Sequence, residues 1–233
     1  VCSITDYAIA PHVHKALTFD QRKDFAPIVE IGYGTVVLVV NADFPPRTVK
    51  ELIVLAKAKP GELSFASSGI GGLQHLNGEM FKQMAGIDLV HVPYKGTSQL
   101  LPDLLAGRVP MAIDSLPAHL PHLKTGKVRV LAVASPTRST TLPDIPTMAE
   151  AGLADFEVNS WYGLLAPAGT PQPIIDRLHA ALTASQDSPE VEKQFAAEGA
   201  IVVKKSPAEF GQFMVTEMKK WEQVVKKGNI KAE

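Results

Sequence analysis

The sequence predicts an α/β protein in which one domain is inserted into another. Short apolar stretches alternate with stretches whose apolar residues recur every three or four positions, which is typical of strands alternating with helices. Two longer apolar runs, 25–41 and 156–166, bracket a middle block of such units. We therefore expect an outer domain from residues 1–40 and 159–233, an inserted ligand-binding domain from 41–158, and mainly parallel sheets.

Composition excludes several classes of protein. A net charge of -1 and the absence of a Lys/Arg stripe argue against a nucleic-acid partner. No apolar run is long enough to span a membrane. Cys2 is the single cysteine, so no intramolecular disulfide can form.

The first third of the chain begins with expected strands and one capped helix. Thr48 followed by Glu51 predicts a capping box for that helix, and Pro60-Gly61 ends it. In order, we expect a strand within 1–9 that runs into a polar turn at Ser3, Thr5 and Asp6, a loop with a helical turn over 11–23, and the long strand over 25–41.

The stretch from Leu63 to Gly86 is the centre of the pattern. It predicts a strand, a turn from Ser67 to Gly72, and a helix from Leu73 that Gly86 terminates. The start of this helix has no capping side chain, so its N–H groups and dipole favour an anion. An ordinary strand-to-helix turn is the alternative.

The turn does not match three familiar loops. A dinucleotide fingerprint needs a third glycine at the position of Gln74. A Walker loop needs a lysine directly after its last glycine, but the first lysine after these glycines is Lys82. A hydrolase elbow needs glycine two positions before its serine, where Phe65 and Ala66 stand. The loop is therefore expected to hold a small anion without attacking it.

Two further strand–loop–helix units follow. The strand at 89–92 leads into Tyr94-Lys95-Gly96-Thr97 and a helix, and the strand at 109–113 ends at Asp114-Ser115. Lys95 is a candidate cation for a ligand, with simple solvent exposure as the alternative. Asp114 is a candidate ligand contact or a cap for the helix that begins at Pro117.

The last part of the chain predicts a return to the outer domain. Trp161 lies in the long strand 156–166, where it is either a core residue or one wall of a cleft. Ser206 and Glu209 predict a capping box for the final helix. The other expected elements are a strand at 128–134, a short helix at 148–151, helices after Pro171 and Pro189, and a strand at 201–203.

Loops at the carboxyl ends of neighbouring strands meet at one edge of a sheet, where ligands bind. Here those loops offer N–H groups, hydroxyls and one lysine, which suit a carboxylate. An enzyme using Ser68 and His75 on a carboxylate or acyl substrate is the alternative. The histidine pairs 12/14 and 119/122 lack a third ligand, so we expect no metal and no cofactor.

Several motifs, taken in order, resemble one known family. They are Lys23-Asp24-Phe25-Ala26-Pro27, Phe65-Ala66-Ser67-Ser68-Gly69, His91-Val92-Pro93-Tyr94-Lys95-Gly96, Leu142-Pro143-Asp144-Ile145-Pro146, and Trp161-Tyr162-Gly163 through Pro171. The chain resembles the Bug family, the extracytoplasmic solute receptors of tripartite tricarboxylate transporters. The resemblance runs from near residue 1 to the last helix.

The resemblance implies a two-domain Venus-flytrap fold that closes on a small organic acid, without enzymatic activity. It implies a periplasmic location and membrane subunits of the transporter as partners. We also expect a monomer, and a receptor that docks on a sensor protein is the alternative. The family's first strand, glycine-rich loop and first helix have no counterpart, so we expect a missing N-terminal segment that held part of the ligand grip and the targeting signal. The residues expected at the ligand site are Ser67, Ser68, Gly69, Gly71, Gly72, His75, Tyr94, Lys95, Gly96, Thr97, Asp114, Ser115, Ser3, Thr5 and Trp161.

Overall fold

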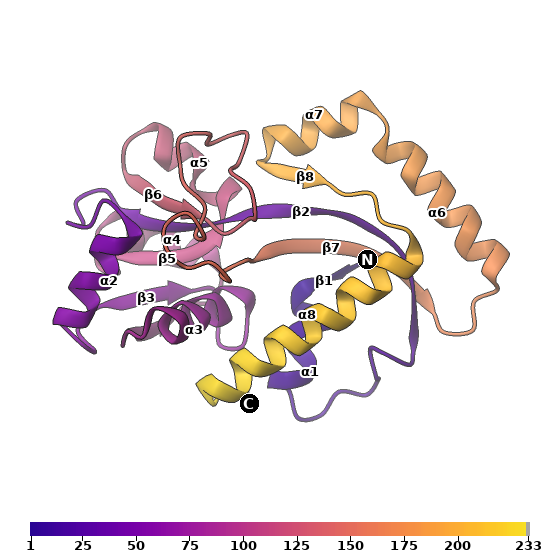
Figure 1. Ribbon diagram of the computed structural model, residues 1–233, viewed down its shortest axis with the longest axis horizontal. Helices are drawn as coiled ribbons and strands as arrows, with labels where there is room; N and C mark the ends of the chain where they lie inside the picture. The colour runs from indigo at the N-terminus through magenta and orange to yellow at the C-terminus, as the bar shows by residue number, and fades with distance from the viewer. Residues whose placement is uncertain (232–233) are drawn as a thin grey trace. The chain divides into compact units, whose positions relative to one another are not determined.

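The computed structural model describes residues 1–231, which form two compact units (Figure 1). Unit 1 contains Val1–Gly34 and the chain from Ser160 onward, and unit 2 is Thr35–Asn159. The chain passes from one unit to the other within two strands, β2 (Phe25–Asn41) and β7 (Asn159–Pro167). As expected for a crossing strand, the first part of β2 pairs in one sheet and its second part in another.

Unit 2 contains a five-stranded sheet with β2 near one edge. Its other strands are β3 (Ser64–Ser67), β4 (Val90–Pro93), β5 (Met111–Ser115) and β6 (Val128–Val133). Their order is β6-β2-β5-β3-β4, with β3 parallel to β4 and β5 and with β2 antiparallel to β5 and β6. The prediction of mainly parallel sheets is therefore wrong outside β5-β3-β4, because the crossing strand β2 runs against its neighbours.

Helices cover both faces of this sheet. They are α2 (Val49–Ala58), α3 (Leu73–Ala85), α4 (Thr97–Leu105) and α5 (Leu116–Lys124). Successive residues of β3 point to opposite faces. Phe65 contacts α3 at Gly78, whereas Ala66 belongs to a buried cluster with Leu100 of α4 and Leu116 of α5. The carboxyl ends of β3, β4 and β5 lead into the starts of α3, α4 and α5 respectively.

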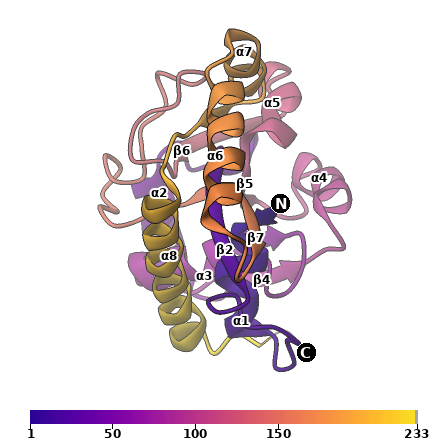
Figure 2. The same ribbon diagram turned by 90° about the vertical axis from the view of Figure 1, so that its right-hand side faces the viewer.

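Unit 1 begins with β1 (Cys2–Ser3), a π-helix η1 (Thr5–Ile9) and α1 (Ala10–Val13). Of the strand and polar turn predicted within 1–9, the strand is confirmed at Cys2–Ser3 only. The apolar residues of 4–9 are instead buried as a helical face that packs on α8 (Pro207–Gly228). The other helices are α6 (Gln172–Gln186) and α7 (Pro189–Ala197), and β8 (Ala200–Val202) pairs with β2. Figure 2 shows α6 on the outer side of the unit 1 strands.

Helix ends follow the predicted signals closely. Thr48 accepts the Glu51 N–H at 3.1 Å, although Glu51 bonds the N–H of Arg47 instead of completing the box. Gly86 ends α3 in the left-handed conformation at φ 61°. The predicted helix at 148–151 is wrong: Thr147 and Glu150 exchange capping bonds, but the chain only turns before Gly152. None of the described helices is both long and apolar enough to cross a membrane.

Candidate functional site

The turn between β3 and α3 leaves backbone donors open. Gly71 adopts φ 78°, a conformation that other residues rarely take, and its N–H donates to His75 Nδ1 at 3.1 Å. Gly72 precedes α3 without any capping side chain. Among the described residues, the N–H groups of Ile70 and Gly72 have no acceptor, and neither do those of the first turn of α3. This part of unit 2 is therefore rich in free N–H donors.

The loop after β4 is fixed against this turn by two backbone hydrogen bonds. Tyr94 N–H donates to Ser67 O at 2.9 Å, and Gly96 N–H donates to Ser68 O at 3.1 Å. Lys95 between them is exposed, and its ammonium forms no ion pair with any described residue. The structure thus brings the predicted 67–72 and 94–97 loops together and leaves one free cation beside them.

Tyr94 itself is tied to the neighbouring helix. Its hydroxyl donates to Asp103 Oδ2 at 2.8 Å. Burial and this bond to a carboxylate raise the pKa of Tyr94 to about 12. The phenol hydrogen is therefore committed to Asp103 and is not available to a ligand.

Asp114 lies at the end of β5 and is 2% exposed. Its Oδ1 accepts from Gln74 Nε2 at 2.9 Å and from the Ser115 N–H at 2.7 Å. Its Oδ2 lies 3.1 Å from His119 Nε2 and accepts from Thr97 Oγ1 at 3.4 Å. Burial alone would raise the pKa of Asp114, but the bonds from His119, Gln74 and Ser115 outweigh it and lower that pKa. One buried carboxylate thus connects the starts of α3, α4 and α5.

Three aromatic rings, those of Phe65, His91 and His75, form a stack beside the turn between β3 and α3. The rings of His75 and His91 stack 3.8 Å apart with 7° between their planes, and His91 stacks in turn on Phe65 at 4.9 Å. Burial lowers the pKa of His75, and burial together with His75 lowers the pKa of His91 to about 4. Both rings are neutral at pH 7, and His75 Nδ1 can therefore accept the Gly71 N–H.

The enzymatic alternative is not supported by this geometry. Ser68 Oγ donates to Gln74 Oε1 at 2.7 Å, and His75 uses Nδ1 for Gly71, so the two residues form no catalytic pair. A different pair forms, with Ser67 Oγ 2.6 Å from His91 Nε2, but the Ser67 side chain is fully buried. Such a hydroxyl supports the loop and cannot reach a substrate. No cluster of three potential metal ligands occurs among the described residues.

The remaining predicted residues lie in unit 1. Ser3 Oγ donates to Asp6 Oδ2 at 2.7 Å, and Thr5 begins η1. Trp161 is fully buried, packs on Phe210 and donates from Nε1 to Glu217 at 3.3 Å. Trp161 is therefore a core residue, the first of its two expected roles, and with no exposed surface it does not form a cleft wall.

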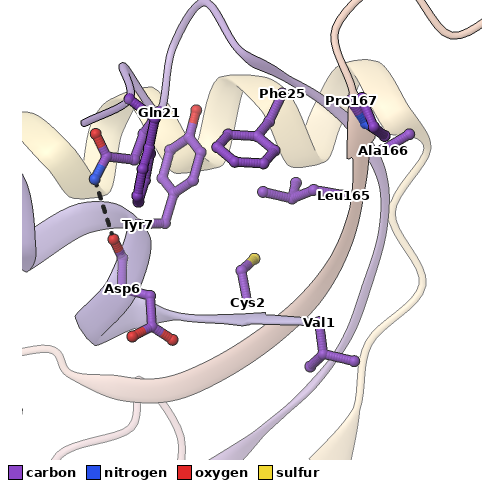
Figure 3. A pocket seen from close by; sticks show the side chains of 10 residues that line it. Val1, Cys2, Asp6, Tyr7, Gln21, Phe25, Leu165, Ala166 and Pro167 are labelled. Atoms are coloured by element: carbon purple, nitrogen blue, oxygen red, sulfur yellow. Dashed lines mark hydrogen bonds between the residues drawn. The ribbon is translucent and has the colours of Figure 1, made fainter. Parts of the chain in front are cut away.

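Unit 1 also contains an apolar pocket of about 250 Å³ (Figure 3). Cys2, Tyr7, Phe25 and Leu165 line it, and a hydrogen bond from Gln21 Nε2 to Asp6 O closes one end. Burial raises the pKa of the Cys2 thiol to about 11, so this group is neutral. No Lys, Arg or His side chain lines the pocket, which makes it unsuited to a carboxylate.

Comparison with known proteins identifies the family. Residues 2–230 match the TctC model, described as the tripartite tricarboxylate transporter family receptor. The chain belongs to this family. BugT of Bordetella pertussis is 34% identical over 224 residues, which cover 96% of this chain and 69% of BugT. A protein of Pseudomonas sp. strain P51 is 36% identical over 208 residues, covering 89% of this chain and 62% of that protein.

Solved structures agree with this assignment. An R. palustris protein with adipate is 35% identical with a TM-score of 0.85, and MatC from Rhodopseudomonas palustris with bound malate is 30% identical with a TM-score of 0.82. The periplasmic binding protein BugD is 32% identical with a TM-score of 0.83. These matches cover 96–99% of this chain and 75–78% of the solved chains. The predicted α/β periplasmic-binding-protein fold is confirmed, and the matched family consists of receptors, not enzymes.

Sequence reasoning missed three residues that organise the site. They are Gln74, which accepts a hydrogen bond from Ser68, His91, which is bonded to Ser67, and His119, which is bonded to Asp114. The pairing of Phe65 with His91 in the β3–β4 register decides the stack, and only a predicted strand pairing would have shown it.

Proposed function

We propose that this protein is a periplasmic receptor that captures a small organic acid and delivers it to a tripartite tricarboxylate transporter. Membership of the TctC family supports the receptor role and the periplasmic location. The related structures with adipate and malate support a carboxylate as the ligand. The chain spans 62% of the Pseudomonas relative's length, so these roles are proposed for the protein of which it is part.

The observation that carries the proposal is the open start of α3. Free N–H groups at Ile70, Gly72 and the first turn of α3 point to an anion, since the positive end of the helix dipole adds to them. Lys95 on the adjoining loop supplies the balancing charge. Glycine at 69, 71 and 72 lets a carboxylate approach the backbone closely.

We assign different tasks to the predicted site residues. In the proposal, Gly69–Gly72 and Lys95 hold the carboxylate, Ser68 and Thr97 contact the rest of the ligand, and Asp114 with His75 positions the loops. Tyr94, Gly96 and Ser115 act through their hydrogen bonds within unit 2. Ser3 and Thr5 stay predicted ligand contacts.

We further propose that the two units are the receptor's two domains, that the receptor acts as a monomer, and that it docks on the transporter's membrane subunits. A sensor protein is a second proposed partner. Affinity capture with the ligand-loaded protein from solubilised membranes tests this, because recovery of a sensor without transporter subunits would contradict the transport role.

A thermal-shift screen of the protein against dicarboxylates, hydroxy acids, amino acids and aromatic acids tests ligand binding. A ligand present at about one hundred times its dissociation constant adds about 2.7 kcal/mol to the free energy of unfolding. For a chain of this size, that corresponds to a rise in Tm of about 5–10 °C. A panel in which no acid shifts the Tm would overturn the proposal.

A matched pair of variants localises the effect. Lys95→Gln is expected to reduce the shift strongly, whereas Lys127→Gln, an exposed lysine after α5, is expected to leave it unchanged. Equal shifts in both variants would contradict the assignment of Lys95.

A further inference from the structure

The hydrogen bonds around Asp114 fix the direction in which several side chains donate. Asp114 is a buried carboxylate, and an ionised carboxylate only accepts hydrogen bonds. Gln74 must therefore turn its Nε2 toward Asp114 Oδ1, which lies 2.9 Å away. The other end of the same amide, Oε1, consequently faces Ser68.

The orientation of Gln74 determines the role of Ser68. Ser68 Oγ lies 2.7 Å from Gln74 Oε1, and an amide oxygen carries no hydrogen. The Ser68 hydroxyl hydrogen is therefore donated to Gln74. Ser68 is half-buried, and its oxygen keeps lone pairs that can accept hydrogen bonds.

Thr97 follows the same rule with a longer bond. Its Oγ1 lies 3.4 Å from Asp114 Oδ2, so its hydrogen also points to the buried carboxylate. The hydroxyl hydrogen of Tyr94 goes to Asp103, and the Ser67 hydroxyl is bonded to Gly69 O and His91. Every hydroxyl of the two loops that contact each other thus has its hydrogen bonded within the protein.

The site is divided into donors and acceptors as a result. The donors are backbone N–H groups near Gly72 and the ammonium of Lys95, whereas the accessible side-chain acceptors are Ser68 Oγ and Thr97 Oγ1. A plain dicarboxylate brings only acceptors and offers no hydrogen to Ser68 Oγ or Thr97 Oγ1. A ligand that carries its own donor satisfies both sets.

We propose that the ligand is a carboxylate bearing a hydrogen-bond donor, a hydroxyl or an amino group, within a few bonds of the carboxylate, and that the Asp114–Gln74–Ser68 chain selects for it. This inference rests on the proposed function and narrows its substrate class.

Calorimetric titration with matched acids tests the selection. Each 2-hydroxy acid is compared with its unsubstituted parent, its 2-amino analogue and its 2-oxo analogue, over chains of three to six carbons. The hydroxy or the amino acid is expected to bind about fivefold more tightly than the parent, since one well-placed hydrogen bond contributes about 1 kcal/mol and about 1.4 kcal/mol is tenfold. The 2-oxo acid, which has only an acceptor there, is expected to bind no better than the parent. Comparing the affinities of the 2-hydroxy and the 2-amino acids shows whether the site prefers a hydroxyl or an amino group as donor.

Two variants test the mechanism of the selection. Ser68→Ala is expected to reduce the preference to near parity while the parent acid still binds. Gln74→Met keeps the size of the side chain but frees the Ser68 hydrogen, so the 2-oxo acid is expected to gain relative to the hydroxy acid. Ser185→Ala, on the exposed surface of α6, serves as control, and melting curves establish that each variant is folded.

The outcomes separate the two proposals. If no acid binds, the receptor function fails and this inference fails with it. If acids bind but parent and 2-oxo acids equal or exceed the hydroxy and amino acids, the receptor function stands and the selection by Ser68 is overturned. An unchanged preference in Gln74→Met would likewise overturn the role of the Asp114–Gln74–Ser68 chain.

Discussion

Helices α3 and α8 begin in opposite ways. Ser206 caps α8 completely, because its side chain accepts the Glu209 N–H while Glu209 accepts the Ser206 N–H at 2.8 Å. Helix α3 begins at Gly72 with no side-chain cap, and Asp114 and His75 fix the surrounding loops instead. A capped helix start stabilises its own helix, whereas the start of α3 leaves its N–H donors without an acceptor in the described part of the protein.

The largest loss of stability is expected from removing Asp114, which fixes the loops around the uncapped start of α3. In Asp114→Ala, the buried His119 and the partly buried Gln74 and Thr97 lose their acceptor, which should lower the free energy of unfolding by about 3 kcal/mol. Urea denaturation measures this loss. Asp144→Ala, at an exposed aspartate of the same unit, is expected to change stability by less than about 0.5 kcal/mol.

A glycine within each helix sharpens the comparison. A Cβ at Gly78 of α3 would lie 2.0 Å from Phe65 Cε2, so Gly78→Ala should destabilise by about 1–3 kcal/mol. At Gly211 of α8 the nearest atom would be Pro27 Cγ at 3.3 Å. Gly211→Ala is therefore expected to be nearly neutral, because the gain in helix propensity of up to about 1 kcal/mol offsets the tight contact. Equal losses in the two variants, measured by denaturant unfolding, would contradict this reading of the α3–β3 packing.

The histidines under the open start should make stability pH-dependent. Burial lowers the pKa of His91 to about 4 and also lowers that of His75, so between that value and about 6.5 the unfolded chain binds protons that the folded chain does not. The two neutral histidines therefore contribute fully to the free energy of unfolding above about pH 6.5. As the pH falls toward 4, the free energy of unfolding decreases by about 1–3 kcal/mol.

Denaturation at several pH values in the wild type and in His91→Phe checks this contribution. The variant keeps the ring stack but should show a clearly smaller loss between pH 6.5 and 4. His14→Gln, at an exposed histidine, should follow the wild type. Parallel curves for His91→Phe and wild type would show that His91 is not responsible.

The smallest effect comes from opening the closed start. Ser206→Ala removes the acceptor for the Glu209 N–H and should lower stability by about 1 kcal/mol. Gly72→Ala removes no cap, and its Cβ would meet no atom closer than 3.7 Å, so a change of only a few tenths of a kcal/mol is expected. Thermal denaturation of both variants tests the contrast, and a larger loss for Gly72→Ala would reverse it.

Local signals determined much of the fold. The Ser206–Glu209 pair fixed the start of α8, Gly86 fixed the end of α3, and the long apolar run 25–41 marked a strand shared by two sheets. The loops after β3 and β4 were also predictable, since parallel strands bring their carboxyl ends to one edge. Each of these features depends on residues a few positions apart or on a regular period.

The hydrogen bonds within the candidate site join residues that are distant in sequence, so they could be seen only in the folded protein. Gln74 and Asp114 are 40 positions apart, and Ser67 and His91 are 24 apart, so their hydrogen bonds depend on strand register and helix rotation. The same distant packing turned residues 4–9 into a helical face and enclosed Trp161 in the core. The local pattern of residues 63–86 predicted where the uncapped start of α3 lies, and an anion site there is the proposal that follows from it. The fold decided in which direction the side chains of Gln74 and Ser68 donate, because these directions depend on Asp114, which is distant in sequence.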